Sequence, residues 1–245
     1  MKEKFEKIYQ MQTELNEKSK RSSRIEPNWG RCVRQEVAEA IDCFPWKHWK
    51  DVDSEIDTLN YFIELVDIYH FIVSAYIDDF PIILLEGNDS ESYRREAFVT
   101  NSIAIYNIMN KYPPKREPAI EELLRNIEDI IQYTFRKYES DEISFENIDD
   151  IMKEQHRINL LYHQFAKVVY MSGYDFERLS TGYIAKNLLN QFRQTHGYAE
   201  GVYRKNWQGR EDNHVLFEWL LNQDKVPSEK EIWSFLVNEY EKVER

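Results

Sequence analysis

Two short stretches, Glu36-Val-Ala-Glu39 and Glu64-Leu-Val-Asp67, each place two carboxylates three residues apart inside an apolar run. At about 100° per residue, residues three apart share a helix face, so each stretch presents an acidic pair if it is helical. A single such pair is usually a solvated helix face. Two pairs on core-forming segments instead favour one shared cation site, because clustered carboxylates that lose hydration repel one another.

The donor types in these stretches indicate which cation they suit. Carboxylate oxygens are hard donors, and His70 is the single candidate imidazole near them, so the set favours Mg²⁺ over zinc. A di-iron carboxylate bundle is an alternative from a different class. It is suggested by the four acids together with Asp67-Ile-Tyr-His70, but that site needs a Glu-x-x-His motif on each of two helices, and the two acidic segments hold no second copy.

The composition of the 245-residue chain indicates an all-α fold, because it has only seven Gly and seven Pro and strictly alternating strands are hard to find. We expect a single domain with a rigid core at about 1–77 and 154–245 and a more mobile helical elaboration at about 78–153. A formal charge of −12 argues against non-specific binding to nucleic acid or to an anionic membrane.

The ends and the cysteines of the sequence bear on where the protein works. The N-terminus lacks the apolar run of a signal peptide, and no run of about 18 apolar residues occurs. Cys32 and Cys43 are too far apart along a helix to suggest a disulfide bond between neighbouring turns. We therefore expect a soluble, cytoplasmic protein with reduced thiols.

Apolar periodicity and punctuation by Pro and Gly predict the helices. We expect helices at about 3–18, 31–43, 54–77, 91–111, 118–138, 144–153, 154–171 and 175–196, and two more within 214–244 that are broken near Pro227. Asp53 or Ser54 is the expected N-cap of the helix at 54–77, and Asp175 that of the helix at 175–196. The polar residues 18–24 are expected to form a loop.

Amides and aromatics near the N-terminal half suggest a base-binding surface. Gln12 and Asn16 are four residues apart, so their amides share a helix face and match a planar hydrogen-bonding ligand. Ordinary surface amides are the alternative. Trp49 follows Pro45-Trp46-Lys47-His48 in a connector, where it suits stacking on a base or packing in the core.

The C-terminal third carries the cations. Lys186, Asn190 and Arg193 share one helix face, and three of the seven glycines follow between 197 and 209, together with Tyr203 and Lys205. A glycine-rich loop lets backbone N–H groups approach an anion, so cations beside four acids suit a metal-bound polyphosphate. The alternative is a surface patch that neutralises charge.

Taken together, these motifs resemble the all-α dimeric dUTPase family, a branch of the all-α nucleoside-triphosphate pyrophosphatases. The superfamily pattern is the pair of acidic motifs. The dUTPase branch adds signatures that this chain carries in order: Gln12 to Asn16, Pro45 to Lys50, Val66 to Phe71, Tyr183 to Arg193, and Gly197 through Asn213. His48 departs from relatives that have an aromatic residue at that position.

The resemblance implies hydrolysis of dUTP, and of dUDP, to dUMP by a homodimer that uses two or more Mg²⁺ ions. It implies that the metal ligands and catalytic groups are Glu36, Glu39, Glu64 and Asp67. The residues implied for uracil and deoxyribose are Gln12, Asn16, Trp49 and Asn190, and those for phosphates are Lys186, Arg193, Tyr203 and Lys205.

Two other functions stay open from sequence. An amide such as Asn190 can present either a donor or an acceptor by flipping, so the sequence does not decide between dUTP and dCTP as the substrate. A dCTP/dUTP pyrophosphatase is therefore the close alternative. A non-catalytic nucleotide-responsive binding protein is the other, although it would not require four carboxylates.

Overall fold

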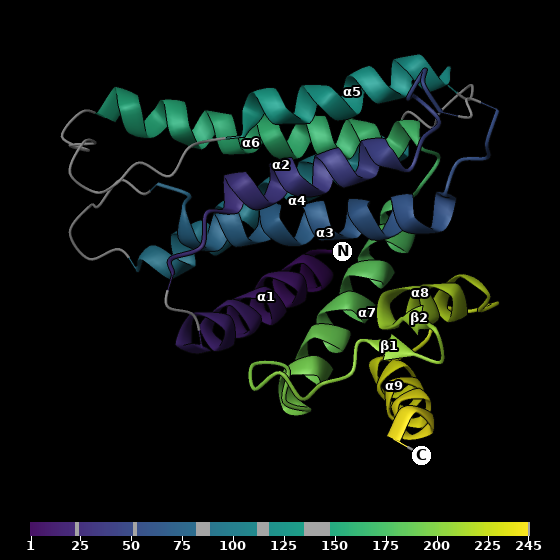
Figure 1. Cartoon of the computed structure of the whole chain (residues 1–245). Coiled ribbons are helices and arrows are strands. Elements are labelled where there is room, and N and C mark those ends of the chain that lie inside the picture. The colour runs from purple at the N-terminus through teal and green to yellow at the C-terminus, as the bar shows by residue number, and fades with distance from the viewer. Residues whose placement is uncertain (23–24, 51–52, 82–88, 112–117, 135–147, 245) are drawn as a thin grey trace.

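The structure is a computed structural model that describes residues 1–22, 25–50, 53–81, 89–111, 118–134 and 148–244 (Figure 1). Within these residues it contains nine helices and one two-stranded sheet, which confirms the predicted all-α fold. The helices are α1 (Lys2–Ser22), α2 (Trp29–Asp42), α3 (Thr58–Asp78), α4 (Ser90–Lys111), α5 (Ile120–Tyr133), α6 (Ile148–Met171), α7 (Phe176–Thr195), α8 (Asp212–Leu221) and α9 (Glu229–Glu244). The strands are β1 (Asn206–Trp207) and β2 (Arg210–Glu211).

Helix α3 is the centre of the fold. Fourteen of its 21 residues are buried, and it contacts α1, α2, α4, α6, α7 and α8. A helix that is apolar on nearly all sides must be covered by neighbours. In Figure 1, α2 runs alongside α3, α5 lies against α2 and α6, and α1 and α7 pack on another side of α3. The second acidic motif is therefore carried by the most enclosed helix.

Side-chain caps fix where the central helices begin. Asn28 accepts a hydrogen bond from the backbone N–H of Arg31 at the start of α2, and Asp175 caps α7 as predicted. The predicted cap of α3 was wrong. Asp57, rather than Asp53 or Ser54, accepts from the backbone N–H of Asn60. Aspartate and serine are both good N-caps, so the sequence did not distinguish these three residues.

Two helices are longer than expected. Helix α1 continues to Ser22, where a loop was predicted, and Lys20 on the added turn donates to Asp78 at 2.7 Å. Lysine and arginine are also good helix formers. The two helices predicted at 144–153 and 154–171 are one helix, α6, from Ile148, because no Gly or Pro interrupts it; residues 144–147 lie outside the described part of the chain.

The C-terminal segment forms a hairpin and two helices. Gln208 and Gly209 both have positive φ, 56° and 90°, which suits the tight turn between β1 and β2. Trp207 on β1 is 1% exposed and packs on Tyr240 of α9 with ring centroids 5.9 Å apart. The prediction of two helices broken near Pro227 is confirmed by α8 and α9.

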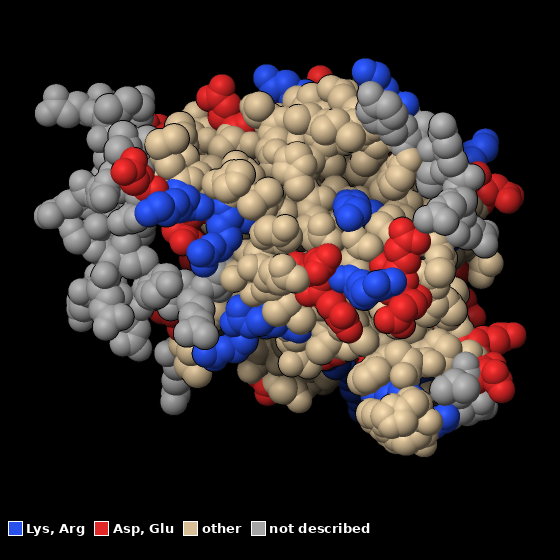
Figure 2. Space-filling view, turned by 90° about the horizontal axis from the view of Figure 1, so that it is seen from above, with Lys and Arg blue, Asp and Glu red and all other residues tan. Residues whose placement is uncertain are grey.

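The structure tests the remaining sequence predictions only in part. Both cysteines are free thiols. Among these residues, no helix combines the length and apolar character needed to cross a bilayer. On the face drawn in Figure 2, basic side chains stand among acidic ones. The predicted lack of non-specific binding to nucleic acid stays a prediction. The greater mobility predicted for about 78–153 stays a prediction; α4 in that region packs on α1, α3 and α6.

Candidate active site

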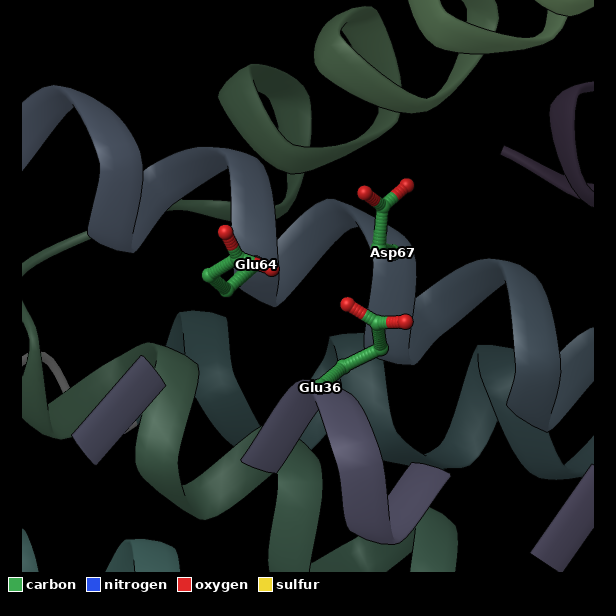
Figure 3. Close-up of side chains that lie close together, drawn as sticks. All are labelled: Glu36, Glu64 and Asp67. Atoms are coloured by element: carbon green, nitrogen blue, oxygen red, sulfur yellow. The ribbon is translucent and has the colours of Figure 1, made fainter. Parts of the chain in front are cut away.

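Three of the predicted acids meet between α2 and α3. One carboxylate oxygen from each of Glu36, Glu64 and Asp67 lies within 4.8 Å of the others. Figure 3 shows Glu36 reaching from α2 toward Glu64 and Asp67 on α3. Oxygens around an octahedral Mg²⁺, bound at about 2.1 Å, lie about 3.0 to 4.2 Å apart. The three side chains therefore fit a hard divalent cation with little movement.

We refer to Glu36, Glu64 and Asp67 as the acid cluster. The electrostatic environment of this cluster favours the binding of a positive charge. Burial raises the pKa of Glu64, and the hydrogen bond it shares with Glu36 and the charge of Asp67 raise it further. Burial and the charge of Asp67 likewise raise the pKa of Glu36. Without a cation, the two glutamates hold a proton between them more strongly than ordinary carboxylates do. A divalent cation would take the place of that proton.

The fourth predicted acid and the nearest lysine lie at the edge of the acid cluster. Glu39, one turn beyond Glu36, is exposed, is not among the three grouped carboxylates and accepts a hydrogen bond from Gln35 at 2.7 Å. Its charge still raises the pKa of Glu36 and Glu64. Lys186 of α7 is buried, and its Nζ donates to an Asp67 oxygen at 2.7 Å. Lys186 therefore places one buried cation at the cluster.

A pocket of about 210 Å³, lined by both polar and apolar side chains, adjoins the acid cluster through Asp67. Its walls come from α1, α2, α3 and α7 and from Tyr198 just after α7, which bring together residues far apart in sequence. Four residues predicted to hold substrate line it, and these are Gln12, Asn16, Asn190 and Arg193. Amides next to a carboxylate cluster suit a ligand with a hydrogen-bonding ring at one end and an anionic tail at the other.

The comparison with known proteins decides the family. A family model described as dUTPase matches residues 4–198, most of the chain. The chain belongs to the dUTPase family. No curated protein is significantly similar to it. The match confirms the predicted resemblance and makes the protein a dUTP diphosphatase, a hydrolase that acts on dUTP.

The sequence reasoning did not identify two hydrogen-bond partners of Gln12 in this dUTPase, Ser74 and Tyr183. Its Nε2 donates to Asn16 Oδ1 and Ser74 Oγ, both at 2.9 Å. Its Oε1 lies 2.6 Å from the Tyr183 hydroxyl and 2.7 Å from His70 Nδ1. Gln12 is 3% exposed, so all of its hydrogen-bonding positions are used inside the protein. Gln12 shapes the pocket wall more than it offers free groups to a ligand.

Two predicted phosphate-binding residues of the dUTPase are paired with an acid. The Arg193 guanidinium holds Asp212 through two hydrogen bonds, Nε to Oδ2 at 2.9 Å and Nη2 to Oδ1 at 2.7 Å. The Tyr203 hydroxyl donates to the same carboxylate at 2.8 Å. Asp212 is 0% exposed. No role was predicted for Asp212, since nothing in its local sequence signals burial beside an arginine 19 positions earlier.

The two remaining predicted residues lie outside the pocket lining. Trp49 is 62% exposed and meets Trp46 edge-on, with ring centroids 5.9 Å apart. Lys205 is exposed and lies over the ring of Tyr198, which does line the pocket, at 5.7 Å from its centroid. Their roles toward base and phosphate in the dUTPase stay predictions.

Proposed function

We propose that this dUTPase hydrolyses dUTP, and dUDP, to dUMP with Mg²⁺ held by Glu36, Glu39, Glu64 and Asp67. The observation that supports this is the convergence of three carboxylates from two helices beside a pocket lined by amides. Glu39 lies one helical turn from Glu36, so it suits a second ion or a ligand reached through water.

The side chains of the site divide the reaction between them. Bound Mg²⁺ neutralises phosphate charge and lowers the pKa of water. Glu36 accepts the proton of the attacking water, whose oxygen bonds to phosphorus as the bond to the leaving phosphate oxygen breaks. Lys186 stabilises charge that develops on the phosphate oxygens. The pocket holds the base and sugar, so that the phosphate chain extends toward the acid cluster.

The first test is a substrate and metal screen of the purified protein. We expect pyrophosphate and dUMP from dUTP in the presence of Mg²⁺, and loss of turnover when EDTA removes the metal, because the acid cluster alone repels the triphosphate. Product would be measured for dUTP, dUDP, dCTP, dTTP and UTP. Undiminished turnover in EDTA would contradict the metal proposal.

The same screen separates the alternatives. A dCTP/dUTP pyrophosphatase would turn over dCTP and dUTP at comparable kcat/KM, whereas the proposed enzyme prefers dUTP. A nucleotide-binding protein without catalysis would bind dUTP and release no pyrophosphate. The non-catalytic binding protein is the less well supported alternative, because binding alone does not require a cluster of three carboxylates with raised pKa values.

A cytoplasmic homodimer is part of the proposal. The family resemblance implies the dimer, and an apolar surface hollow between α4 and α6 offers area to bury. This hollow is lined by Ile105, Ile108, Met109, His163, Ala166, Lys167 and Tyr170, and Ile108 is 54% exposed. Sedimentation velocity at micromolar concentration is expected to give twice the mass of the 29.7 kDa chain, and a monomer there would refute the dimer.

A further inference from the structure

One acid lies behind the wall of the pocket and accepts from three donors. Asp78 is the last residue of α3, and it is not among the described residues that line the pocket. Its Oδ2 accepts from Trp29 Nε1 at 2.9 Å and from Asn16 Nδ2 at 3.4 Å, and its Oδ1 accepts from Lys20 Nζ at 2.7 Å. These contacts join the end of α1, the start of α2 and the end of α3, which lie near one another in Figure 1.

An acid at this position is unfavourable unless it has partners. The last carbonyl groups of a helix carry partial negative charge, and the Asp78 side chain is only 15% exposed. The Lys20 side chain is 46% exposed, so water can replace that partner. Trp29 and Asn16 are buried, at 8% and 3% exposed. The two bonds to Oδ2 are therefore the contacts that the protein cannot exchange for water without cost.

Both buried donors belong to the pocket wall. Trp29 and Asn16 line the pocket, and the Trp29 ring stacks on Phe71, another lining residue, with ring centroids 5.9 Å apart and 26° between the ring planes. The Oδ1 end of the Asn16 amide accepts from Gln12, and Asp78 holds the Nδ2 end. Asp78 therefore fixes an aromatic ring and an amide of the wall from outside the pocket.

We propose that Asp78 is a positioning residue that holds Trp29 and Asn16 in the arrangement that binds the nucleoside, with Oδ2 as the acting atom. The inference rests on the proposed function of the site. A wall that is already in place loses less conformational freedom when a ligand binds. Without this acceptor the indole N–H turns toward water, and the nucleotide has to restore the wall as it binds. The loss falls on binding, since neither wall residue belongs to the acid cluster.

The first variant removes the acceptor. For Asp78→Ala we expect KM for dUTP to rise about tenfold while kcat stays within about twofold, because the wall contacts the nucleoside equally before and during the reaction. Initial rates at saturating Mg²⁺ measure both parameters. A fall in kcat with an unchanged KM would overturn the proposal.

The second variant separates the acceptor from the charge. Asp78→Asn keeps one oxygen for Trp29 and Asn16, and its amide nitrogen can face Lys20, whose exposed side chain is able to move into water. We expect KM to stay within about twofold of the unchanged protein. Lys20→Met removes only the ion pair and should have the same small effect. If Asp78→Asn is impaired as much as Asp78→Ala, the charge acts and not the acceptor, and the proposal is overturned.

A control on the same helix separates positioning from stability. Tyr76 of α3 is buried and donates to Asn159 Oδ1 at 2.6 Å, and it is not among the described residues that line the pocket. Tyr76→Phe also removes a buried hydrogen bond, so it should lower the melting temperature and leave KM within about twofold. A rise in KM as large as that of Asp78→Ala would show that lost stability is sufficient, which contradicts a positioning role.

A binding measurement keeps this inference separate from the proposed reaction. Calorimetry with dUMP on the full chain in EDTA requires neither metal nor turnover. We expect Asp78→Ala to weaken dUMP binding about tenfold and Asp78→Asn to keep it within about twofold. Equal affinity of Asp78→Ala and the unchanged protein, or no binding by either, would overturn the inference. Binding of dUMP that depends on Asp78, without any hydrolysis of dUTP, would refute the proposed reaction alone.

Discussion

Glu36→Gln is expected to lower kcat for dUTP by about 10²- to 10⁴-fold, the range for loss of a general base, while the protein remains folded. Glu36 is the one member of the acid cluster contributed by α2, so its removal leaves the two acids of α3 without the carboxylate opposite them. Glutamine has nearly the same shape, but it neither accepts the proton of water nor brings negative charge to Mg²⁺.

The melting temperature of the variant is the control for this prediction, because it shows whether the protein remains folded. The metal-free protein buries carboxylates that raise one another's pKa, so Glu36→Gln should leave its melting temperature unchanged or higher. Glu39→Gln is the matched variant, because Glu39 is exposed and outside the grouped carboxylates, and we expect a smaller loss. Initial rates of pyrophosphate release at saturating dUTP and Mg²⁺ measure both. Near-normal turnover of Glu36→Gln would refute its role as the base.

The convergence of the acid cluster was predictable because it depends on helix periodicity and burial alone. Spacing of three residues put each pair on one face, and the apolar flanks of both segments predicted that the helices would pack together. The structure brings Glu36, Glu64 and Asp67 together as expected. Glu39 is the exception. It shares the face of Glu36, but it lies one turn along α2, where the side chain is exposed.

The pairing of the basic side chains was not predictable from spacing. Lys186 and Arg193 read as equivalent cations on one face of α7, yet Lys186 pairs with Asp67 at the acid cluster and Arg193 pairs with Asp212. The difference arises in the segment that begins at Gly197, where three glycines with positive φ, Gly197, Gly201 and Gly209, precede the return of Asp212 to α7. The local turn propensities of the residues predict where such a segment turns, but they do not predict which of its residues becomes buried.

The starting residues of the helices also depend in part on contacts that the local sequence does not predict. The start of α7 at Asp175 was predicted because few competing caps precede it, whereas Asp53, Ser54 and Asp57 compete at the start of α3. The winner is Asp57, whose backbone N–H also donates to the Cys43 carbonyl at the end of α2. That contact joins the two acidic helices, and it depends on the fold and not on the local sequence.

Asp212→Ala is expected to lower the free energy of unfolding by about 3 to 5 kcal/mol, because it leaves the buried Arg193 guanidinium without its carboxylate. Asp212 also accepts from Tyr203 and joins α7, the glycine-containing segment and α8 in one hydrogen-bonded group. For a chain of this size, such a loss corresponds to a fall in melting temperature of roughly 10 °C. Urea and thermal denaturation followed by circular dichroism measure both quantities.

Two further variants test whether the unpaired charge of Arg193 causes the loss of stability in Asp212→Ala. Tyr203→Phe removes one hydrogen bond to Asp212 and no charge, so we expect a loss of only about 1 kcal/mol. Asp212→Ala combined with Arg193→Met removes both charges. It should be more stable than Asp212→Ala alone, because no buried ion remains without a partner. If the double variant instead loses the sum of the two single losses, the ion pair does not couple the residues and the explanation fails.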